Sequence, residues 1–204
     1  MDNAVTLVQA YLRLNGYFTI TEFPIVEAIK HGGHRTATDI DVMAVRFPGA
    51  GRLVTQSGKR SHHDRIITGV DPVLGVSLGD ADMIIGEVKE GKAQINSGGR
   101  DQSVLRTALV RFGCCHDEKV SEMVHFLIQK GHAQTQHGHN IRLVAFGSIL
   151  PESNPGYLTI GLGHIIDFTK AYLQDNWDVF RVTDLKDPAL GFLSTMIKSS
   201  RISS

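Results

Sequence analysis

The sequence predicts an α/β protein in which one central mixed β-sheet is flanked by helices. Three observations lead to this fold class. An amphipathic stretch with helical spacing comes first, at residues 3–15. Three strand-like stretches follow it, and two helical stretches then precede a further apolar strand. Helices on both sides of a run of strands are typical of a sheet with helical layers, and 204 residues suffice for one sizeable core.

The N-terminal half predicts one helix followed by strands. The helix places its apolar side chains on one stripe and stops at Asn15-Gly16, a common C-terminal signal. The next stretch is rich in β-branched and aromatic residues and predicts a strand that bends at Pro24. Residues 49–80 are Gly-rich and weakly patterned, so we interpret them as an insertion. The expected elements are a helix at 3–15 and strands at 17–29, 38–47 and, within the insertion, 52–55.

The C-terminal half predicts helices that alternate with strands. Gly113 and Gly131 each end an amphipathic helix, and Asp187-Pro188 opens a short terminal helix. The Ser-rich tail after Lys198 is expected to be disordered. The expected elements are strands at 82–90, 141–147 and 157–162 and helices at 101–112, 117–130 and from 164 onward. The expected organisation is one domain over 1–204, with a core at about 3–147 and a C-terminal strand–helix extension at 148–204.

Composition indicates an ordinary globular protein. Lys plus Arg equals Asp plus Glu at 21 each, so the net charge is zero and gives no general attraction to nucleic acid. No apolar run approaches the roughly 20 residues that span a bilayer, and the N-terminus has no signal-peptide pattern. The two cysteines are adjacent, which excludes a disulfide framework and favours a reducing compartment. These features predict a cytoplasmic protein without membrane association.

Charged residues interrupt two otherwise apolar strands. Side chains alternate along a strand, so Asp41 shares a face with its apolar neighbour Met43, and Glu87 and Lys89 share a face with Ile85. If the two strands pair, these charges meet at one edge of an apolar layer. Burying them without compensation costs several kcal/mol each. A divalent cation held between Asp41 and Glu87 removes that cost, and carboxylate oxygens suit Mg²⁺ or Mn²⁺.

The lysine completes the chemistry that this cluster predicts. Lys89 can orient or deprotonate a water, or neutralise charge that develops on a phosphate. The same ions often bind through one or two carboxylates together with a substrate phosphate. Two carboxylates, a lysine and a divalent ion therefore predict metal-assisted hydrolysis of a phosphodiester.

The sequence resembles the PD-(D/E)xK nuclease superfamily, which has the restriction-endonuclease-like fold. The resemblance covers roughly residues 3–147, and it rests on the element order together with DIDV at 39–42 and GEVK at 86–89. It implies that the family's aspartate is Asp41, that the acidic residue and lysine of its E-x-K motif are Glu87 and Lys89, and that the backbone carbonyl of Val88 completes the metal site. The resemblance also implies Mg²⁺ (or Mn²⁺) as cofactor and DNA as substrate.

One family feature is missing. Many members have a glutamate in the first helix, whereas here Gln9 is the comparable polar residue. Glu22 or Glu27 on the following strand are alternatives for that position, and the difference leaves one metal ion or two open.

Several other polar residues are candidates for substrate binding. Residues 46–65 carry five basic residues and one acid, a pattern typical either of a phosphate-contacting loop or of a solvated surface loop. Family members often place residues that orient the substrate or the lysine after the E-x-K motif. The residues there are also typical helix caps or solvent-facing groups; they are Gln94, Asn96, Arg100 and Gln102. The candidates for substrate contact are Arg60, Arg65, Arg100 and Gln102.

A Cys/His-rich region offers a competing interpretation. Its members are Cys114, Cys115, His116, His125, His132, His137 and His139. No CxxC pair is present and the histidines are irregularly spaced, so we expect no zinc site. A cysteine nucleophile paired with one of these histidines has no local signature, and free cysteine is more often a small core residue.

The function predicted from the sequence is a Mg²⁺-dependent nuclease with nucleic acid, DNA before RNA, as its partner. A homodimer is left open. The chief alternative is a catalytically inactive protein of the same fold that binds nucleic acid or another protein. A third interpretation is an unrelated α/β domain in which Glu87 and Lys89 lie on a solvated edge strand.

Overall fold

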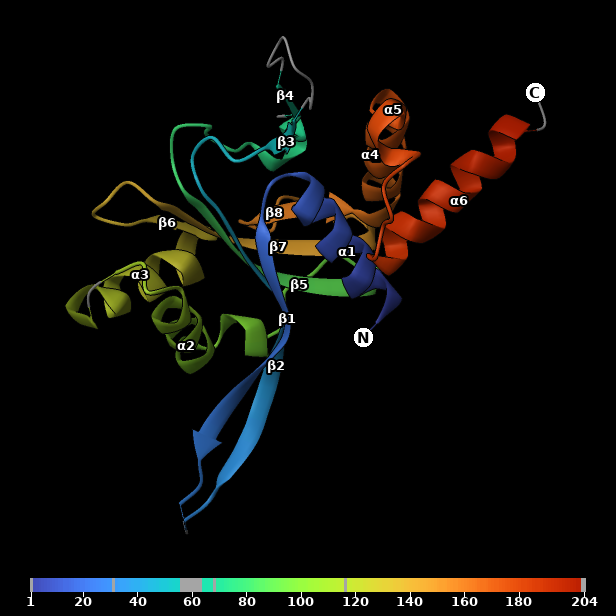
Figure 1. Ribbon diagram of the computed structural model, residues 1–204. Helices are drawn as coiled ribbons and strands as arrows, with labels where there is room; N and C mark the ends of the chain where they lie inside the picture. Colours follow the sequence, from blue (N-terminus) through green and yellow to red (C-terminus); the bar gives the residue numbers. More distant parts are fainter. Residues whose placement is uncertain (1, 31, 56–63, 68, 116, 203–204) are drawn as a thin grey trace.

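The centre of the molecule is one mixed, strongly curled six-stranded sheet (Figure 1). The structure is a computed structural model that describes residues 2–30, 32–55, 64–67, 69–115 and 117–202. The strand order is β1-β2-β5-β7-β6, with β8 also paired to β7. The β5–β7 and β7–β8 pairs are parallel, and the other pairs are antiparallel. The strands are β1 Phe18–Ala28, β2 His34–Arg46, β5 Asp82–Lys92, β6 His132–Gln134, β7 Asn140–Ile149 and β8 Leu158–Gly161.

Helices cover both faces of this sheet. One face packs against α1 and α4, and the other packs against α2 and α3. The chain ends in α5 and α6, which pack against α1 and α4 in a third apolar cluster. Strands β3 and β4 form a separate two-stranded sheet between β2 and β5 along the chain. Two 3₁₀ turns, η1 and η2, lie before and after β5. These elements are α1 Asn3–Leu14, β3 Arg52–Val54, β4 Arg65–Ile67, η1 Pro72–Leu74, η2 Gly98–Arg100, α2 Gln102–Phe112, α3 Asp117–Lys130, α4 Leu162–Asp175, α5 Trp177–Phe180 and α6 Pro188–Ile202.

Strand β5 is apolar because both of its faces are covered. Ile84 and Val88 pack on the side of α1, whereas Met83 and Ile85 pack on the side of α2 and α3. All four are buried. The alternation places Glu87 on the same side as Met83 and Ile85. A charged side chain here enters a packed layer between the sheet and α2.

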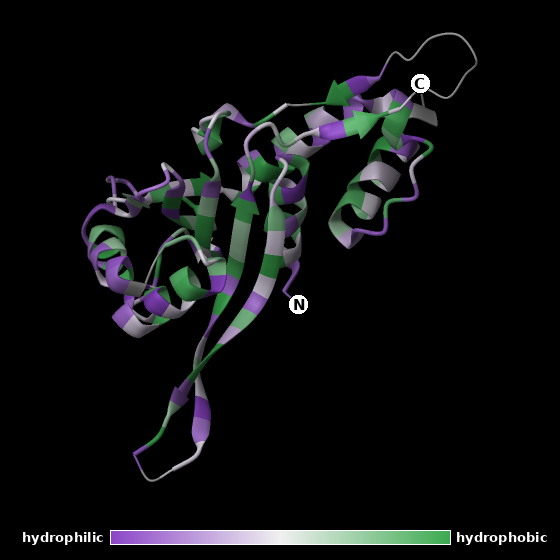
Figure 2. Cartoon of the chain, turned by 60° about the vertical axis from the view of Figure 1, so that its left-hand side comes forward, coloured by the Kyte–Doolittle hydropathy of each residue, from purple (hydrophilic) through white to green (hydrophobic). Residues whose placement is uncertain are grey.

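The β1–β2 hairpin extends beyond the rest of the sheet. Its ladder continues to the pair Ala28↔His34, whereas the pairing of β2 with β5 stops at Val42↔Gly86. We call residues 23–40 the arm. Figures 1 and 2 show the arm leaving the body of the protein as a twisted two-stranded ribbon.

The predicted fold class is confirmed at the level of an α/β protein with a mixed sheet and flanking helices. Four details were wrong or missing. Strand β2 begins at His34 rather than at 38, because pairing with β1 makes polar, exposed residues extended. Strands β4 and β6 were not expected; each is three residues long and is defined by its partner strand. Helix α6 continues to Ile202, past the predicted start of a disordered tail.

No helix among the residues described is long and apolar enough to cross a membrane.

Candidate functional site

The structure brings Asp41, Glu87 and Lys89 together at the base of the arm. Asp41 lies on β2, and the other two residues lie on β5. The last pair of the β2–β5 ladder is Val42↔Gly86, so Asp41 and Glu87 are the first residues past it on each strand. The two strands separate at this point, and the acidic side chains occupy the place where the sheet opens. We call Asp41, Glu87 and Lys89 the acidic centre.

Asp41 fills a position in the backbone hydrogen-bond pattern. Its Oδ2 accepts a hydrogen bond from the backbone N–H of Val88 at 2.7 Å. The side chain thus replaces the carbonyl that a paired strand would offer to this donor. The contact fixes the Asp41 carboxylate beside Glu87. It also shows that Val88 meets Asp41 through its amide group.

Glu87 is buried, with 7% of its surface exposed. Its Oε1 accepts hydrogen bonds from Lys89 Nζ at 2.5 Å and from Asn96 Nδ2 at 2.6 Å. Asn96 is held in turn, because its Oδ1 accepts a hydrogen bond from Gly99 N at 2.6 Å. A Cβ atom at Gly99 would lie only 3.2 Å from Glu87 Oε2. In the loop from β5 to α2, Asn96 therefore orients Glu87 through its Oε1, and the missing side chain of Gly99 leaves room for its Oε2.

The electrostatics of the acidic centre are unbalanced. Burial raises the pKa of Glu87 above its ordinary value, Lys89 opposes this shift, and the negative charge of Asp41 adds to it. The hydrogen bond to Glu87 raises the pKa of Lys89, so this side chain is an ammonium at neutral pH. Two carboxylates and one ammonium leave a net charge of about −1 with both acids ionised. A cation therefore stabilises this arrangement.

The donor set fits a hard divalent cation. Within the described part of the chain, Asp41 Oδ1 and Glu87 Oε2 accept no hydrogen bond, so each acid keeps one oxygen available. No group of three or more His, Cys, Asp or Glu side chains suited to a metal occurs among the described residues. Two carboxylates with water and backbone oxygens match the way Mg²⁺ binds to proteins, since it retains several waters. The protonated state of Lys89 favours an orienting or charge-neutralising role over proton abstraction.

The interpretation of Glu87 as part of a solvated edge strand is wrong, whereas Lys89 is half-exposed. Strand β5 lies between β2 and β7 up to Gly86, and beyond that residue it keeps β7 as its paired strand. Glu87 is nearly inaccessible there, and its carboxylate is bound by side chains from its own strand and from the next loop. Buried charges of this kind need compensation.

The alternatives for a helix glutamate lie in different places. Gln9 is buried on α1, which covers the face of the sheet opposite Glu87. Glu27 lies on the arm, where it forms an ion pair with Arg35 at 2.5 Å. Glu22 lies on β1 between Thr21 and Phe23, whose ladder partners Val42 and Ile40 are on either side of Asp41, so Glu22 is the alternative closest to the centre along the ladder. Its backbone is left-handed, with φ of 52°, and a non-glycine residue in this conformation is strained.

Of the candidate substrate-binding residues, Arg100 and Gln102 follow β5 in the chain, whereas Arg65 lies away from the acidic centre. Arg100 follows Asn96 in the loop, stacks over the Tyr157 ring at 5.0 Å, and has a buried Nε without a hydrogen bond. Gln102 is exposed at the start of α2. Arg65 is not brought to the centre, because it lies on β4 and donates hydrogen bonds to Asp178 and Asn176 near α5. Arg60 lies outside the described residues.

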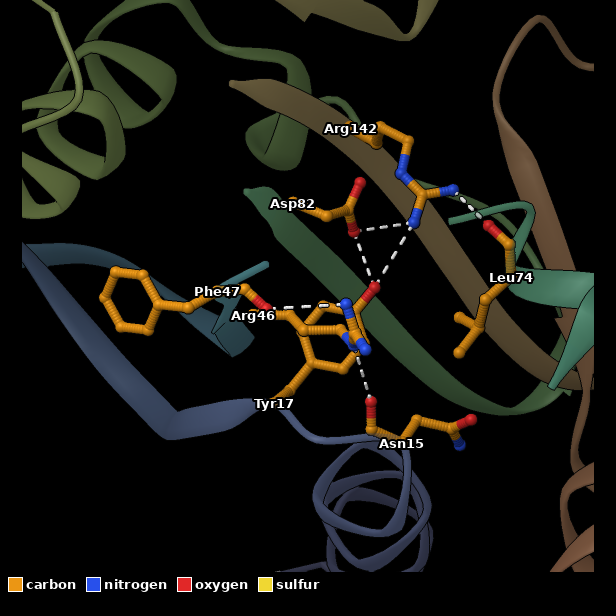
Figure 3. A network of polar contacts seen from close by, with 7 residues as sticks. All are labelled: Asn15, Tyr17, Arg46, Phe47, Leu74, Asp82 and Arg142. Atoms are coloured by element: carbon orange, nitrogen blue, oxygen red, sulfur yellow. Dashed lines mark hydrogen bonds and ion pairs between the residues drawn. The ribbon is translucent and has the colours of Figure 1, made fainter. Parts of the chain in front are cut away.

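Sequence reasoning missed a second polar cluster at the other end of β5 (Figure 3). Asp82 Oδ2 accepts hydrogen bonds from Tyr17 OH at 2.6 Å and from Arg142 Nη2 at 2.7 Å, and Arg142 Nη1 donates to the carbonyl of Leu74. Burial raises the pKa of Tyr17, and Asp82 adds to the shift. Burial opposes the charge on Arg142, but the hydrogen bonds and charge interactions with Asp82 and Tyr17 together outweigh burial and raise its pKa.

The neighbouring buried groups extend this cluster. Arg46 is 1% exposed and donates to the carbonyls of Asn15, Phe47 and Ala50. Asp71 accepts hydrogen bonds from Tyr11 OH at 2.7 Å and lies 2.6 Å from His164 Nε2. The available sequence signal was a charge inside an apolar strand, Arg142 between Ile141 and Leu143. Such a charge predicts a buried partner.

Burial makes Cys114 a poor candidate for a nucleophile. The Cys114 and Cys115 sulfurs lie 4.0 Å apart, and burial raises the pKa of Cys114 to about 12. A thiol with so high a pKa is a poor nucleophile at neutral pH. The rings of His137 and His139 are 6.0 Å apart, and His116 lies outside the described residues. The expectation that this region binds no zinc stays a prediction.

Comparisons of the chain with protein-family models, with curated proteins and with solved structures found no match.

Proposed function

We propose that the protein is a metal-dependent nuclease of the restriction-endonuclease-like class that hydrolyses phosphodiester bonds of DNA. The observation that carries this proposal is the acidic centre, a buried carboxylate pair with one ammonium at the point where β2 and β5 separate. The order of α1, β1, β2, β5 and α2 also agrees with the PD-(D/E)xK pattern. An excess negative charge with free carboxylate oxygens is suited to a divalent cation.

Asp41 and Glu87 would hold Mg²⁺ or Mn²⁺ through their free oxygens. When bound, the ion supplies Lewis acidity and stabilises negative charge on the phosphate. Val88 fixes Asp41 through its amide hydrogen, and Asn96 fixes Glu87. These contacts keep the ligands in place before the ion arrives, which is the arrangement that electrostatic catalysis requires.

Lys89 has the role of a charged hydrogen-bond donor. Its ammonium contacts Glu87 directly, and 43% of its side chain is exposed, so it can also reach a substrate. From this position it can orient a water or donate to a phosphate oxygen. Arg100 is the candidate cation for a flanking phosphate, because it lies in the same β5–α2 loop as Asn96, which holds Glu87. Arginine binds phosphate well through its planar set of donors.

The second candidate is an inactive protein of this fold that binds nucleic acid or another protein. Two observations favour it. Lys89 compensates part of the acidic charge without a metal, and no acidic residue on α1 completes the centre. The balanced net charge of the chain also gives no general attraction to DNA.

Two substitutions separate these functions. Glu87→Gln keeps the size of the side chain but removes a ligand charge, so metal affinity and cleavage should both fall. Lys89→Met keeps the aliphatic stem, so metal should still bind while hydrolysis falls by about 10²–10⁴-fold. The matched controls are Glu90→Gln and Lys92→Met, which alter exposed residues of the same strand and should leave both properties unchanged.

The assay combines calorimetric titration of Mg²⁺ and Mn²⁺ with cleavage of linear, nicked and branched DNA. Wild-type protein that binds neither ion and cuts none of these substrates would favour the inactive binding protein. A Lys89→Met variant with full activity would remove the lysine from the mechanism.

A further inference from the structure

The arm has an anchored base and an exposed tip. Ile25 and Ile40 are buried in the core shared with α2 and α3, at 2% and 4% exposure. Beyond them, every described residue of 26–38 is exposed or half-buried. We call residues 26–38 the arm tip. At about 3.3 Å per residue, five residues from Ile25 to the turn carry it roughly 15 Å away from the core. Among the residues that the structure describes, Figure 2 shows no other helix or strand beside the arm tip.

The arm begins at the acidic centre. Asp41 follows the buried base residue Ile40 directly, and the β2–β5 ladder ends at the next position. Any polymer with one of its phosphates at Asp41 and Glu87 therefore lies next to the arm. The arm is anchored at its base by Ile25 and Ile40, and the β1–β2 ladder continues from there into the tip past an irregularity in register between Ile25 and Val26.

Charge changes sign along the arm. Its base carries Asp39, and Glu22 lies just before the arm on β1, so both acids are close in sequence to the acidic centre or to its paired strand. The described residues of the tip include Lys30 and Arg35 against the single acid Glu27. Glu27 already forms an ion pair with Arg35. Acids therefore lie where a cation would bind, and the distant end carries a small positive excess, with Lys30 exposed beside the Glu27–Arg35 pair.

We propose that the arm tip binds duplex DNA in the groove beside the phosphodiester held at the acidic centre. This inference rests on the proposed function and narrows its substrate to double-stranded DNA. The B-DNA major groove is about 12 Å wide and admits a two-stranded β-ribbon. The tip is such a ribbon, and its threonine hydroxyls and basic side chains are groups that contact phosphates and base edges.

An alternative occupant of the tip is a second copy of the chain. Val26 and Ile29 are exposed, at 58% and 43%. They are separated by the charged and small residues Glu27 and Ala28, and cations flank them at Lys30 and Arg35. The tip thus combines apolar contact with positive charge, which favours a polyanion over an uncharged protein surface.

The test measures DNA affinity rather than cleavage. The variant Lys30→Glu/Arg35→Glu reverses both tip cations. The control Arg181→Glu/Lys186→Glu makes the same change in net charge at exposed residues between α5 and α6. Affinity for a 25-base-pair duplex and for one of its strands is measured by fluorescence anisotropy, with Ca²⁺ to prevent hydrolysis and over a range of salt concentrations. If the double variant does not fold, Lys30→Glu alone carries the test.

The tip variant should lose at least about tenfold in duplex affinity relative to the control, with a salt dependence lower by up to about two ion equivalents. Its affinity for the single strand should change much less. Equal duplex affinities for tip and control variants would overturn the proposal, and so would equal losses on duplex and single strand. A change from dimer to monomer in sedimentation, without loss of DNA affinity, would assign the tip to a second copy instead. If the wild-type protein needs the tip for duplex binding but cleaves no DNA, the inference about the tip stands and the proposed nuclease activity is rejected.

Discussion

The two ends of β5 each bury an acid, and they treat it differently. Asp82 meets a tyrosine hydroxyl and a largely buried guanidinium, which both donate to its Oδ2, and the buried cation Arg46 is its ladder partner on the neighbouring strand. Glu87 meets one ammonium and one amide, and a second carboxylate lies beside it. The negative charge of Asp82 is balanced by the guanidinium of Arg142. The negative charges of Glu87 and Asp41 together exceed the single positive charge of Lys89.

This difference separates a structural acid from a candidate functional one. A buried acid paired with a largely buried cation resists change, because removing one partner leaves the other charge without compensation. A buried acid with a like charge beside it and a half-exposed ammonium as its counterion is destabilised until a cation binds. Perturbed acids of this kind are concentrated at functional sites. The contrast leads to four predictions, from the largest expected effect to the smallest.

Asp82→Asn should lower the free energy of unfolding by about 3–5 kcal/mol, because it leaves Arg142 buried without a counterion. Glu87→Gln should change the same quantity by less than about 1 kcal/mol, since it removes a charge that the metal-free protein poorly compensates. Urea denaturation without divalent ions measures both. Equal losses for the two variants would remove the distinction between the ends of the strand.

Divalent ions should stabilise the protein through the Glu87 end only. A concentration of Mg²⁺ or Mn²⁺ one hundred times Kd should add about 2.7 kcal/mol to the free energy of unfolding of the wild type. Asp41→Asn should abolish this gain, while Asp82→Asn should retain it on its lower baseline. Thermal melts with and without the ion measure the shift. A gain that survives in Asp41→Asn would place the ion elsewhere.

The pH dependence of stability should carry the signature of Glu87. Burial, with a contribution from Asp41, raises its pKa above the ordinary 4.5, so the folded protein holds the proton more tightly than the unfolded chain. The free energy of unfolding without metal should therefore fall as pH rises from 4.5 through the raised pKa. Divalent affinity should rise over the same interval, because the ion binds the carboxylate.

Glu87→Gln is the control for this pH effect, since its side chain does not titrate. Its denaturation midpoint should lack the fall that the wild type shows above pH 4.5. An identical pH profile for the two proteins would mean that another group causes the change.

Arg65→Ala should have the smallest effect. Its bond to Asp178 joins side chains that are 48% and 63% exposed, and such pairs contribute about 0–1 kcal/mol. Its position on β4 also predicts unchanged cleavage. Arg100→Ala, by contrast, should weaken DNA binding, because Arg100 lies in the loop that holds Asn96 and Glu87. Filter binding of both variants makes the comparison, and a stronger loss at Arg65 would move the substrate path toward α5.

Local pattern was sufficient to predict the elements of the acidic centre. Glu87 and Lys89 stand two residues apart on an apolar strand, and alternation alone places them together. The pairing of β2 with β5 was a single further hypothesis, which the ladder confirms. Asn96 was considered only as one of several polar residues, since its contact with Glu87 depends on the path of a loop.

Long-range contacts account for what sequence reasoning missed. Tyr17, Asp82 and Arg142 come from three separated segments, and no periodicity relates them. The arm is a similar case. Residues 34–37 have no apolar alternation, and they are extended because β1 offers them backbone partners. Such strands depend on their neighbours rather than on intrinsic preference.

The spacing of the two acids on β5 limits how this gene can vary. Asp82 and Glu87 are five positions apart, an odd number, and so they face opposite layers of the protein. Inserting or deleting one codon between them would turn one acid into the wrong layer. An insertion of two codons would restore the faces but shift Glu87 by about 7 Å along the strand, away from Asp41. This segment should therefore accept point substitutions while its length stays fixed.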